Sequence, residues 1–364
     1  MSKLKKIKLF DPKFDSREIH VATKALKSSH WASGLGIGKV SEFESKFRNY
    51  TNAKECVAVN SGTAALHLAL NLFDVKRKEV LVPSLTFIST IHSILYNGGK
   101  PRFVDIDPNT LCIDPIDIER KVTKNTAAII PVHFGGMPSD IKKISKIADQ
   151  KSLQLIYDAA HACGANNNKK KIGSEKDIVC FSFHPIKNLA MPKGGAITIN
   201  TKNSRSLKKK LNSLRWCGIG NRDGPNYDIT TLGFNYYMDE ISASIGIEQL
   251  KKLERSNAKR FDIAKRYSTE IKTDKKMPIN KNSCYHLYWI RVKNRNKFLK
   301  NMASKGIEVG VHYPPAHNTS FYQSNIHLPI TESIGKEIVT LPMHPNLKEN
   351  DIDMVIKTTN HFIF

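Results

Sequence analysis

Short apolar segments alternate with longer segments of mixed polarity along most of the chain. The apolar segments have the length of strands, and the mixed segments repeat their apolar positions with the period of an amphipathic helix. The predicted strands are 56–60, 79–83, 101–107, 126–132, 153–160, 178–183 and 194–199. Helices are predicted between them, including 63–73, one that runs through Ile94 and one that starts at Ser139. This alternation predicts an α/β fold with a mostly parallel sheet covered by helices on both faces.

Two further regions flank this pattern. Before the first strand, Ser41 and Glu44 have the spacing of a capping box and predict the start of a helix through residue 50. After the last strand, residues 233–271 form a long helical region. A strand at 285–292, the segment 308–313 and helices at 331–339 and 350–356 follow. We therefore expect a large domain at 1–250 and a smaller α+β domain at 251–364.

Composition agrees with a globular protein. The chain has 364 residues, of which 40% are hydrophobic, so it can bury a sizeable core. Its first residues lack the apolar core of a secretion signal, and no segment has the length and apolarity of a membrane span, so a cytoplasmic location is expected. The 6 cysteines are scattered without a CxxC pair, so we expect neither a disulfide framework nor a metal site.

The charge balance leaves a second class of function open. The 57 basic and 33 acidic residues give a net charge of +24, which is compatible with binding to nucleic acid or to a membrane surface. However, the lysine runs at 169–171 and 208–210 have no interleaved aromatic residues. Such runs are typical of a solvated surface, and the positive field also favours small anionic substrates.

Lys187 is the most informative single residue. It lies in the segment His184–Lys193, which must form a loop between two predicted strands. The ends of parallel strands line the ligand crevice of α/β folds, and a lysine held there can form a Schiff base. On its own, a lysine of so basic a chain is more simply a surface charge.

Other candidate residues also follow predicted strands. Ser61, Gly62 and Thr63 join a strand to a helix, where free amides and a hydroxyl can bind phosphate, although an ordinary helix cap has the same pattern. Asp158 ends one strand and Phe87 follows another. A carboxylate there can simply cap the next segment, and a phenylalanine is usually core. Together, a phosphate cradle, a ring-stacking aromatic, a carboxylate and a lysine meet the needs of pyridoxal phosphate.

Longer motifs carry a family resemblance. They include WASGLGIGKVSEFE, AVNSGTAALHLAL, FVDIDPNTLCID, YDAAHACGA, FSFHPIKN, GFNYYMDE and GVHYPPAH. These segments, in this order from about residue 30 to the C-terminus, resemble the DegT/DnrJ/EryC1/StrS aminotransferases. The resemblance implies the fold of type I pyridoxal phosphate enzymes, a large cofactor domain, a small C-terminal domain, and a homodimer with active sites at the subunit interface.

The resemblance also assigns roles to individual residues. It makes Lys187 the Schiff-base lysine, Asp158 the partner of the pyridine nitrogen and Phe87 the stacking aromatic. It places His161 beside the pyridine hydroxyl. Phosphate contacts are implied for Ser61, Gly62, Thr63 and Ser182, with Asn235 reaching the phosphate from the partner chain. The substrate pocket is implied to contain His312, Tyr313 and His317.

The implied reaction moves an amino group from L-glutamate to a nucleotide-linked keto sugar. His161 and the HPIKN setting of the lysine resemble family members that act on 4-keto sugars. Three positions depart from the family pattern: Lys193 replaces a glutamate, Cys217 a histidine and Tyr237 an arginine. These changes leave the cofactor set intact and affect the charges that face the substrate.

Two alternative functions are compatible with part of the sequence. Sugar dehydratases of the same family carry histidine at the Schiff-base position, so Lys187 argues against that activity. A nucleic-acid-binding regulator rests on the net charge alone, and the intact cofactor residues argue against it.

Overall fold

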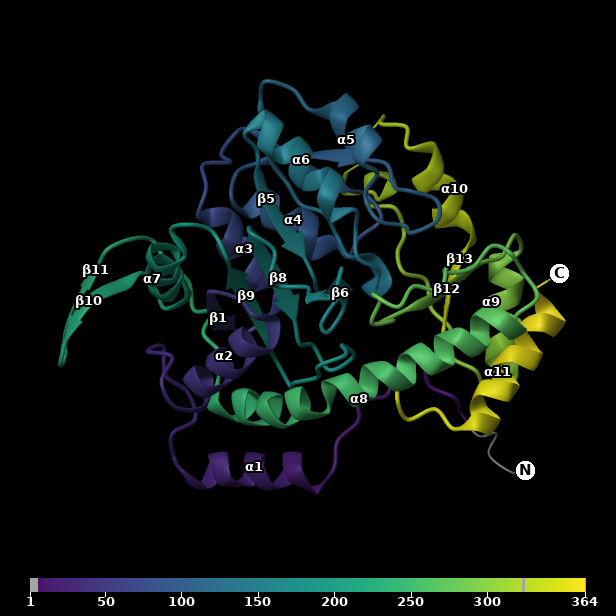
Figure 1. Cartoon of the computed structure of the whole chain (residues 1–364), viewed down its shortest axis with the longest axis horizontal. Helices are drawn as coiled ribbons and strands as arrows, with labels where there is room; N and C mark the ends of the chain where they lie inside the picture. Colours follow the sequence, from purple (N-terminus) through teal and green to yellow (C-terminus); the bar gives the residue numbers. More distant parts are fainter. Residues whose placement is uncertain (1–5, 323–324, 364) are drawn as a thin grey trace.

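A seven-stranded sheet lies at the centre of the computed structural model, which describes residues 6–322 and 325–363 (Figure 1). Its strand order is β1-β9-β8-β5-β4-β2-β3, with bounds β1 Glu55–Val59, β2 Glu79–Pro83, β3 Lys100–Val104, β4 Thr126–Ile129, β5 Gln154–Asp158, β8 Ile178–Ser182 and β9 Gly195–Ile199. The pairs from β8 through β5, β4 and β2 to β3 are parallel, whereas β9 is antiparallel to both β8 and β1. The predicted mostly parallel sheet is therefore confirmed.

Helices bury both faces of this sheet, which explains why its strands are continuous apolar runs. On one face, Val57 and Ile156 belong to a core shared with α3 Gly62–Asn71, α4 Ile88–Tyr96 and α7 Ser204–Arg215. On the other face, Ala58 and Tyr157 belong to a core shared with α2 Gly38–Thr51, α5 Pro115–Lys121, α6 Ile141–Lys151 and the first part of α8 Glu240–Glu270. Adjacent residues of one strand thus point into different cores.

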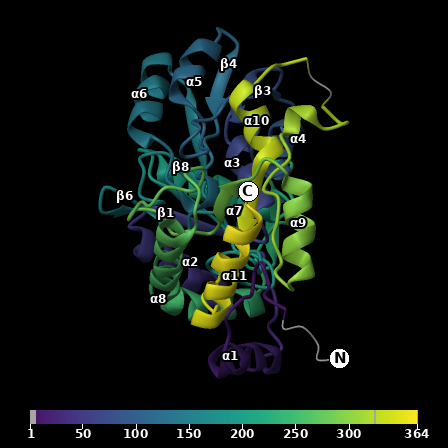
Figure 2. The same ribbon diagram turned by 90° about the vertical axis from the view of Figure 1, so that its right-hand side faces the viewer.

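A third core lies mainly in the C-terminal part of the chain and also includes Leu85, Ile106 and Phe134 from the segments after β2, β3 and β4. The strands β12 Tyr288–Arg291 and β13 Ile338–Leu341 pair antiparallel, and the helices beside them are α9 Arg295–Ser304, α10 Pro329–Glu337 and α11 Glu349–Phe362. Figure 2 shows α11 between α8 and α9, both of which it contacts. The N-terminal segment joins this core, since the Ile7 amide donates to the Gly306 carbonyl at 2.8 Å. The domain boundary near residue 250 stays a prediction.

Smaller elements complete the described chain: α1 Ser16–Lys27, the hairpins β6 Asn166–Asn167 with β7 Lys170–Lys171 and β10 Ile219–Asp223 with β11 Asn226–Ile229, and the 3-10 helices η1 Phe134–Gly136 and η2 Ala316–Asn318. The hairpin β10–β11 projects from the body beside α7 (Figure 1). In the part of the chain that the structure describes, no helix combines the length and apolarity needed to cross a bilayer.

Three local predictions are wrong. The long helix expected from residue 233 begins only at Glu240, where Asp239 caps it by accepting the Ser242 amide. The helix α2 begins at Gly38, so Ser41 and Glu44 lie inside it and do not cap it. Glu44 instead accepts the Ala58 amide and the Arg215 guanidinium, contacts that arise only when distant segments meet. The helix expected at 331–339 ends at Glu337, because Ile338 enters the β13 ladder opposite Arg291.

The Glu44–Arg215 ion pair is expected to stabilise the fold substantially. Its Nη1 and Oε1 atoms are 2.5 Å apart, and the side chains are 1% (Arg215) and 10% (Glu44) exposed. Glu44→Gln leaves a buried cation without its counter-charge, so the free energy of unfolding should fall by about 3 kcal/mol. Urea titration followed by circular dichroism measures this. Glu42→Gln, which removes exposed ion pairs with Lys39 and Lys46 on the same helix, should cost under about 1 kcal/mol, and equal losses would contradict the expectation.

Candidate active site

A cavity of about 340 Å³ opens at the carboxyl edge of the parallel strands. Four of the loops that line it follow β1, β2, β5 and β8, and a further wall comes from the C-terminal part of the chain. The cavity brings together most of the candidate residues: Ser61, Gly62, Thr63, Phe87, Asp158, His161, Ser182, Lys187, His312 and Tyr313. Residues that are far apart in sequence meet here because strands of one direction end at the same edge.

Lys187 lies in the loop between β8 and β9, as predicted. The loop is fixed by backbone hydrogen bonds, with the Lys187 amide donating to the His184 carbonyl and the Met191 amide to the Phe183 carbonyl, each at 2.8 Å. Burial lowers the pKa of the Lys187 amine to about 8, while the nearby Asp158 carboxylate opposes this shift. The amine is therefore neutral far more often near physiological pH than a surface lysine is.

Asp158 ends β5 and is 4% exposed. Its Oδ2 accepts the Thr90 hydroxyl at 2.7 Å, and its Oδ1 accepts the Ala160 amide at 2.9 Å. Among the described residues no cation forms an ion pair with it, and burial raises the pKa of its carboxyl group. A buried carboxylate that lines a cavity under these conditions is stabilised by a cationic group of a ligand.

The turn between β1 and α3 forms another wall. Ser61 caps α3 by accepting the Ala64 amide on its Oγ at 3.1 Å, so the N-terminus of the helix faces the cavity. A Cβ atom at Gly62 would lie 2.6 Å from the Cβ of Ser182, so only glycine fits between the two walls. Helix amides, two serine hydroxyls and a threonine hydroxyl thus converge where a phosphate can bind.

Aromatic side chains also line the cavity. Phe87 is 55% exposed, an unusual state for a phenylalanine beside a core, and its ring centroid is 5.8 Å from that of Tyr313. The Tyr313 hydroxyl lies 3.1 Å from His161 Nε2. Because the Gly135 amide donates to His161 Nδ1, the neutral ring carries its proton on Nε2 and donates it to Tyr313. Burial keeps His161 neutral by lowering its pKa well below the ordinary value.

Two candidate residues do not line this cavity. His317 was expected in the substrate pocket, but its side chain is 0% exposed and its Nδ1 lies 2.6 Å from the Ser84 hydroxyl, with Glu332 at its other nitrogen. The ring turns inward because both of its nitrogens find partners there. Asn235 is exposed, and its carbonyl accepts a hydrogen bond from Asn60 Nδ2 at 3.3 Å.

The sequence did not identify every residue around the site. Thr90, which holds Asp158, lies inside α4, and His286 lies beside Lys187, with 3.4 Å between their nitrogens. A threonine in a helix and a histidine within an apolar segment carry no local signal of function. Lys193 and His184 also line the cavity, so the lysine that departs from the family pattern faces the site.

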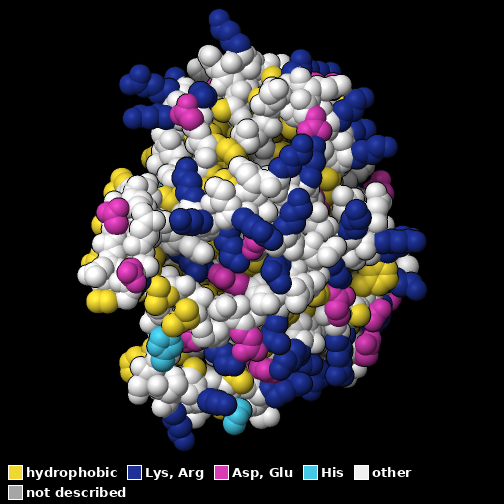
Figure 3. Space-filling view, turned by 60° about the vertical axis from the view of Figure 1, so that its left-hand side comes forward, with side chains coloured by type: hydrophobic (Ala, Val, Ile, Leu, Met, Phe, Trp, Pro, Cys, Tyr) yellow, Lys and Arg dark blue, Asp and Glu magenta, His cyan; other side chains and the backbone are white. Residues whose placement is uncertain are grey.

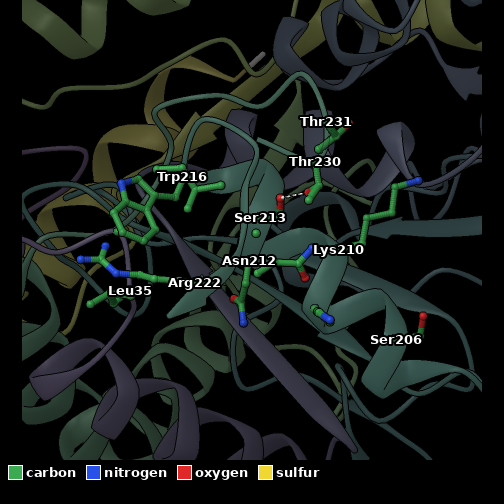
Figure 4. Close-up of a pocket in the computed structure, with 14 residues that line it drawn as sticks. Leu35, Ser206, Lys210, Asn212, Ser213, Trp216, Arg222, Thr230 and Thr231 are labelled. Atoms are coloured by element: carbon green, nitrogen blue, oxygen red, sulfur yellow. Dashed lines mark hydrogen bonds between the residues drawn. The ribbon is translucent and has the colours of Figure 1, made fainter. Parts of the chain in front are cut away.

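A second hollow of about 600 Å³ lies between α7 and the hairpin β10–β11 (Figure 4). Trp216 and Arg222 lie together on one side, with the guanidinium 5.4 Å from the ring centroid, and Ser213 contacts Thr230 on the other. No aspartate, glutamate, histidine or cysteine is found among the described residues that line it. Of these two cavities, only the smaller one is therefore lined by histidine and aspartate side chains among the described residues. The described residues also contain no cluster of three or more such side chains that could hold a metal ion.

The sheet and the position of its cavity define the fold of the type I pyridoxal phosphate aminotransferases. The chain belongs to the DegT/DnrJ/EryC1/StrS aminotransferase family, whose profile matches residues 12–360. It is 34% identical to the uncharacterised protein MJ1066 of Methanocaldococcus jannaschii, with 97% of each chain covered. These matches confirm the resemblance that the sequence motifs indicated.

Solved structures of sugar aminotransferases have the same fold as this chain. Spr1654 from Streptococcus pneumoniae, assigned as a sugar aminotransferase, has a TM-score of 0.93 at 27% identity, with 98% of this chain and 97% of that chain covered. PseC of Helicobacter pylori, an aminotransferase involved in the biosynthesis of pseudoaminic acid, has a TM-score of 0.91 at 25% identity, with 99% of each covered. Members of the family depend on pyridoxal phosphate, and Spr1654 has been solved in PLP, PMP and apo forms. The protein is thus a member of a family of sugar aminotransferases.

Proposed function

We propose that this protein is a cytoplasmic, homodimeric aminotransferase that uses pyridoxal phosphate to move an amino group from L-glutamate to a nucleotide-linked keto sugar, with a 4-keto sugar favoured. The observation that carries the proposal is the meeting of Lys187, Asp158 and the N-terminus of α3 in one cavity. The three groups suit the aldehyde, the ring nitrogen and the phosphate of one cofactor.

The residues present fit this cofactor. Because a Cβ atom at Gly62 would clash with Ser182, residue 62 carries no side chain that could cover the amides at the N-terminus of α3, which suits a phosphate there. The Asp158 carboxylate has neutral hydrogen-bond donors and no paired cation among the described residues, which suits a protonated ring nitrogen. The exposed ring of Phe87 offers a flat apolar surface on which an aromatic ring can stack.

The side chains of this chain would act as follows. Pyridoxal phosphate, when bound, supplies an aldehyde that reacts with amines and a ring that takes up electrons. Asp158 would hold a proton at the ring nitrogen through a charge-assisted hydrogen bond. Lys187, whose pKa of about 8 leaves part of the amine neutral, would remove and return the proton at the substrate Cα. His161 would keep the Tyr313 hydroxyl oriented towards the cavity.

The substrate assignment is supported by the relatives and by charge. Lys193 and Lys187 both line the cavity, and Asp158 is the one carboxylate among the described residues that line it. The site therefore favours an anionic substrate. A nucleotide-linked sugar carries such charge on its phosphates, and L-glutamate carries two carboxylates. Turnover of UDP-, GDP- and dTDP-linked keto sugars with glutamate, read by mass, tests the assignment. Loss of a sugar hydroxyl without gain of nitrogen would instead indicate a dehydratase.

The homodimer is supported by two exposed features. The arm β10–β11 and the segment after it expose Tyr227, Ile229 and Leu232, with Leu232 85% exposed. Asn235 is exposed and does not line the cavity of its own chain, as expected of a residue that serves the cavity of a partner. Apolar side chains on a projecting arm are typical of an interface between subunits.

The net charge does not require a nucleic-acid partner. On the face shown in Figure 3, lysine and arginine side chains are spread from top to bottom with acidic side chains between them. Such a distribution supports a solvated basic surface over a binding stripe. Steeply salt-dependent binding of DNA by protein that takes up no pyridoxal phosphate would overturn this interpretation.

Asp158→Asn is expected to lower kcat by about 10²–10³-fold, because an amide offers no counter-charge to a protonated ring nitrogen. The measurement is steady-state transamination together with the near-ultraviolet circular dichroism of the fold. Glu175→Gln is the control, since that carboxylate is also buried but contacts the Gly173 amide away from the cavity. Equal activity of the wild type and Asp158→Asn would contradict the assigned role.

A further inference from the structure

A chain of buried hydrogen bonds runs from two backbone carbonyls to the site. Asn257, on α8, donates from Nδ2 to the Cys163 carbonyl at 3.1 Å. Asn188 donates from Nδ2 to the Cys284 carbonyl and to Asn257 Oδ1, each at 2.9 Å. Carbonyl oxygens only accept, so both amide groups have one possible orientation. The Oδ1 atom of Asn188 must therefore point away from these partners.

That oxygen faces His286, whose Nδ1 is 3.2 Å from it. Because an amide oxygen cannot donate, Nδ1 must carry the proton of the imidazole. In the neutral ring Nε2 then holds a lone pair, and this atom lies 3.4 Å from Lys187 Nζ. The orientation of Asn188 thus decides that the histidine accepts from the lysine.

The surroundings keep His286 neutral. Its side chain is 1% exposed, and burial lowers its pKa well below the ordinary value. The charged and titratable groups that act on it, Lys187, His161, Arg260 and His312, all shift the pKa in the same direction. Its Nδ1 partner is an amide, so no carboxylate stabilises an imidazolium. Phe10 stacks on the ring with 5.7 Å between the two centroids.

We infer that His286 is a positioning residue, locked by Asn188 and Asn257 as the tautomer that accepts a hydrogen bond from the Lys187 amine. A neutral amine has two hydrogens and one lone pair. Donation of one hydrogen to His286 restricts rotation of the amine, so that the lone pair has two possible directions and no longer three. The same network ties the lysine loop to α8 and to the segment before β12. The catalytic role of Lys187 rests on the proposed function, whereas the contact between Lys187 and His286 is given by the structure.

The tautomer can be tested on the unmodified holoprotein. With selective ¹⁵N labelling of histidine, the His286 signals, assigned by their absence in His286→Gln, should show a protonated Nδ1 and a bare Nε2. They should not titrate between about pH 6 and pH 9, because burial and the neighbouring cations oppose protonation. A protonated Nε2 would overturn the inference whatever the variants do.

The contact with Lys187 can be tested without catalysis. The pH dependence of Lys187 acetylation by acetic anhydride in the cofactor-free protein, read by peptide mass, should have a midpoint near 8. His286→Phe keeps the packing against Phe10 and removes the acceptor. An acceptor favours the ammonium, so its loss should lower the midpoint by about one unit. His286→Gln retains an acceptor oxygen and should restore most of the shift.

Kinetics complete the test. His286→Phe should lower kcat by about 10–100-fold with little change in KM, because the amine is misplaced while substrate binding is kept. His286→Gln should retain most of kcat. If both variants lose the same activity and neither moves the acetylation midpoint, His286 only fills space and the inference is wrong. If the midpoint moves in a protein that performs no transamination, the proposed function fails and the positioning role stands.

Discussion

Lys187→Ala is expected to abolish transamination, with a loss of more than about 10⁴-fold, because it removes both the amine that binds the cofactor and the group that moves the proton. The loop between β8 and β9 holds the amine in the cavity, and burial of the amine lowers its pKa to about 8. The purified wild type should be yellow and should lose this absorbance on reduction with borohydride. Peptide mass spectrometry should find the reduced adduct on Lys187.

Lys193→Ala is the matched control, since it removes another lysine that lines the same cavity. It should leave the colour and the reducible adduct intact. Its effect should fall on KM for the anionic substrate, because it removes a charge and no reacting group. A colourless wild type that takes up no pyridoxal phosphate, or an adduct on Lys193, would refute the cofactor assignment.

Mixing Lys187→Ala with Asn235→Asp is expected to restore activity to two inactive proteins. If Asn235 serves the phosphate site of its partner, a mixed dimer has one site with both lesions and one with neither. Half of randomly formed dimers are mixed, so about one quarter of the wild-type activity should return. The carboxylate introduced by Asn235→Asp should inactivate the site of the partner subunit, because it would face the phosphate there.

The mixing experiment needs proof of exchange. Two different affinity tags, purified in sequence, isolate the mixed dimer and give its activity directly. Pyridoxal phosphate should also strengthen association, since a ligand that binds the dimer better than the separated chains favours the dimer. Mixed dimers that stay inactive would show that Asn235 serves its own subunit.

The sequence by itself determined the class of fold and the centre of the site. Strands buried on both faces are continuous apolar runs, so each strand of the sheet could be predicted from its own short segment. Lys187, Asp158 and the turn at Ser61 follow such runs, and the ends of parallel strands must meet at one edge. Each of these features depends on a short segment and on a general rule of sheet topology.

Tertiary structure decided which side chains complete the site. His317 turns inward because Ser84 and Glu332, distant in sequence, bind both of its nitrogens. Glu44 had the spacing of a cap, but α2 begins at Gly38, and Glu44 binds the Ala58 amide and Arg215 from distant segments instead.

The His286 tautomer likewise depends on two distant residues. Asn188 lies 98 residues before His286, and Asn257 lies 69 residues after Asn188. Hydrogen-bond partners and burial are properties of the assembled chain, and the pattern of one segment does not contain them. The sequence therefore located the reacting lysine, whereas only the packing of α8 and the C-terminal part against its loop decided how that lysine is held.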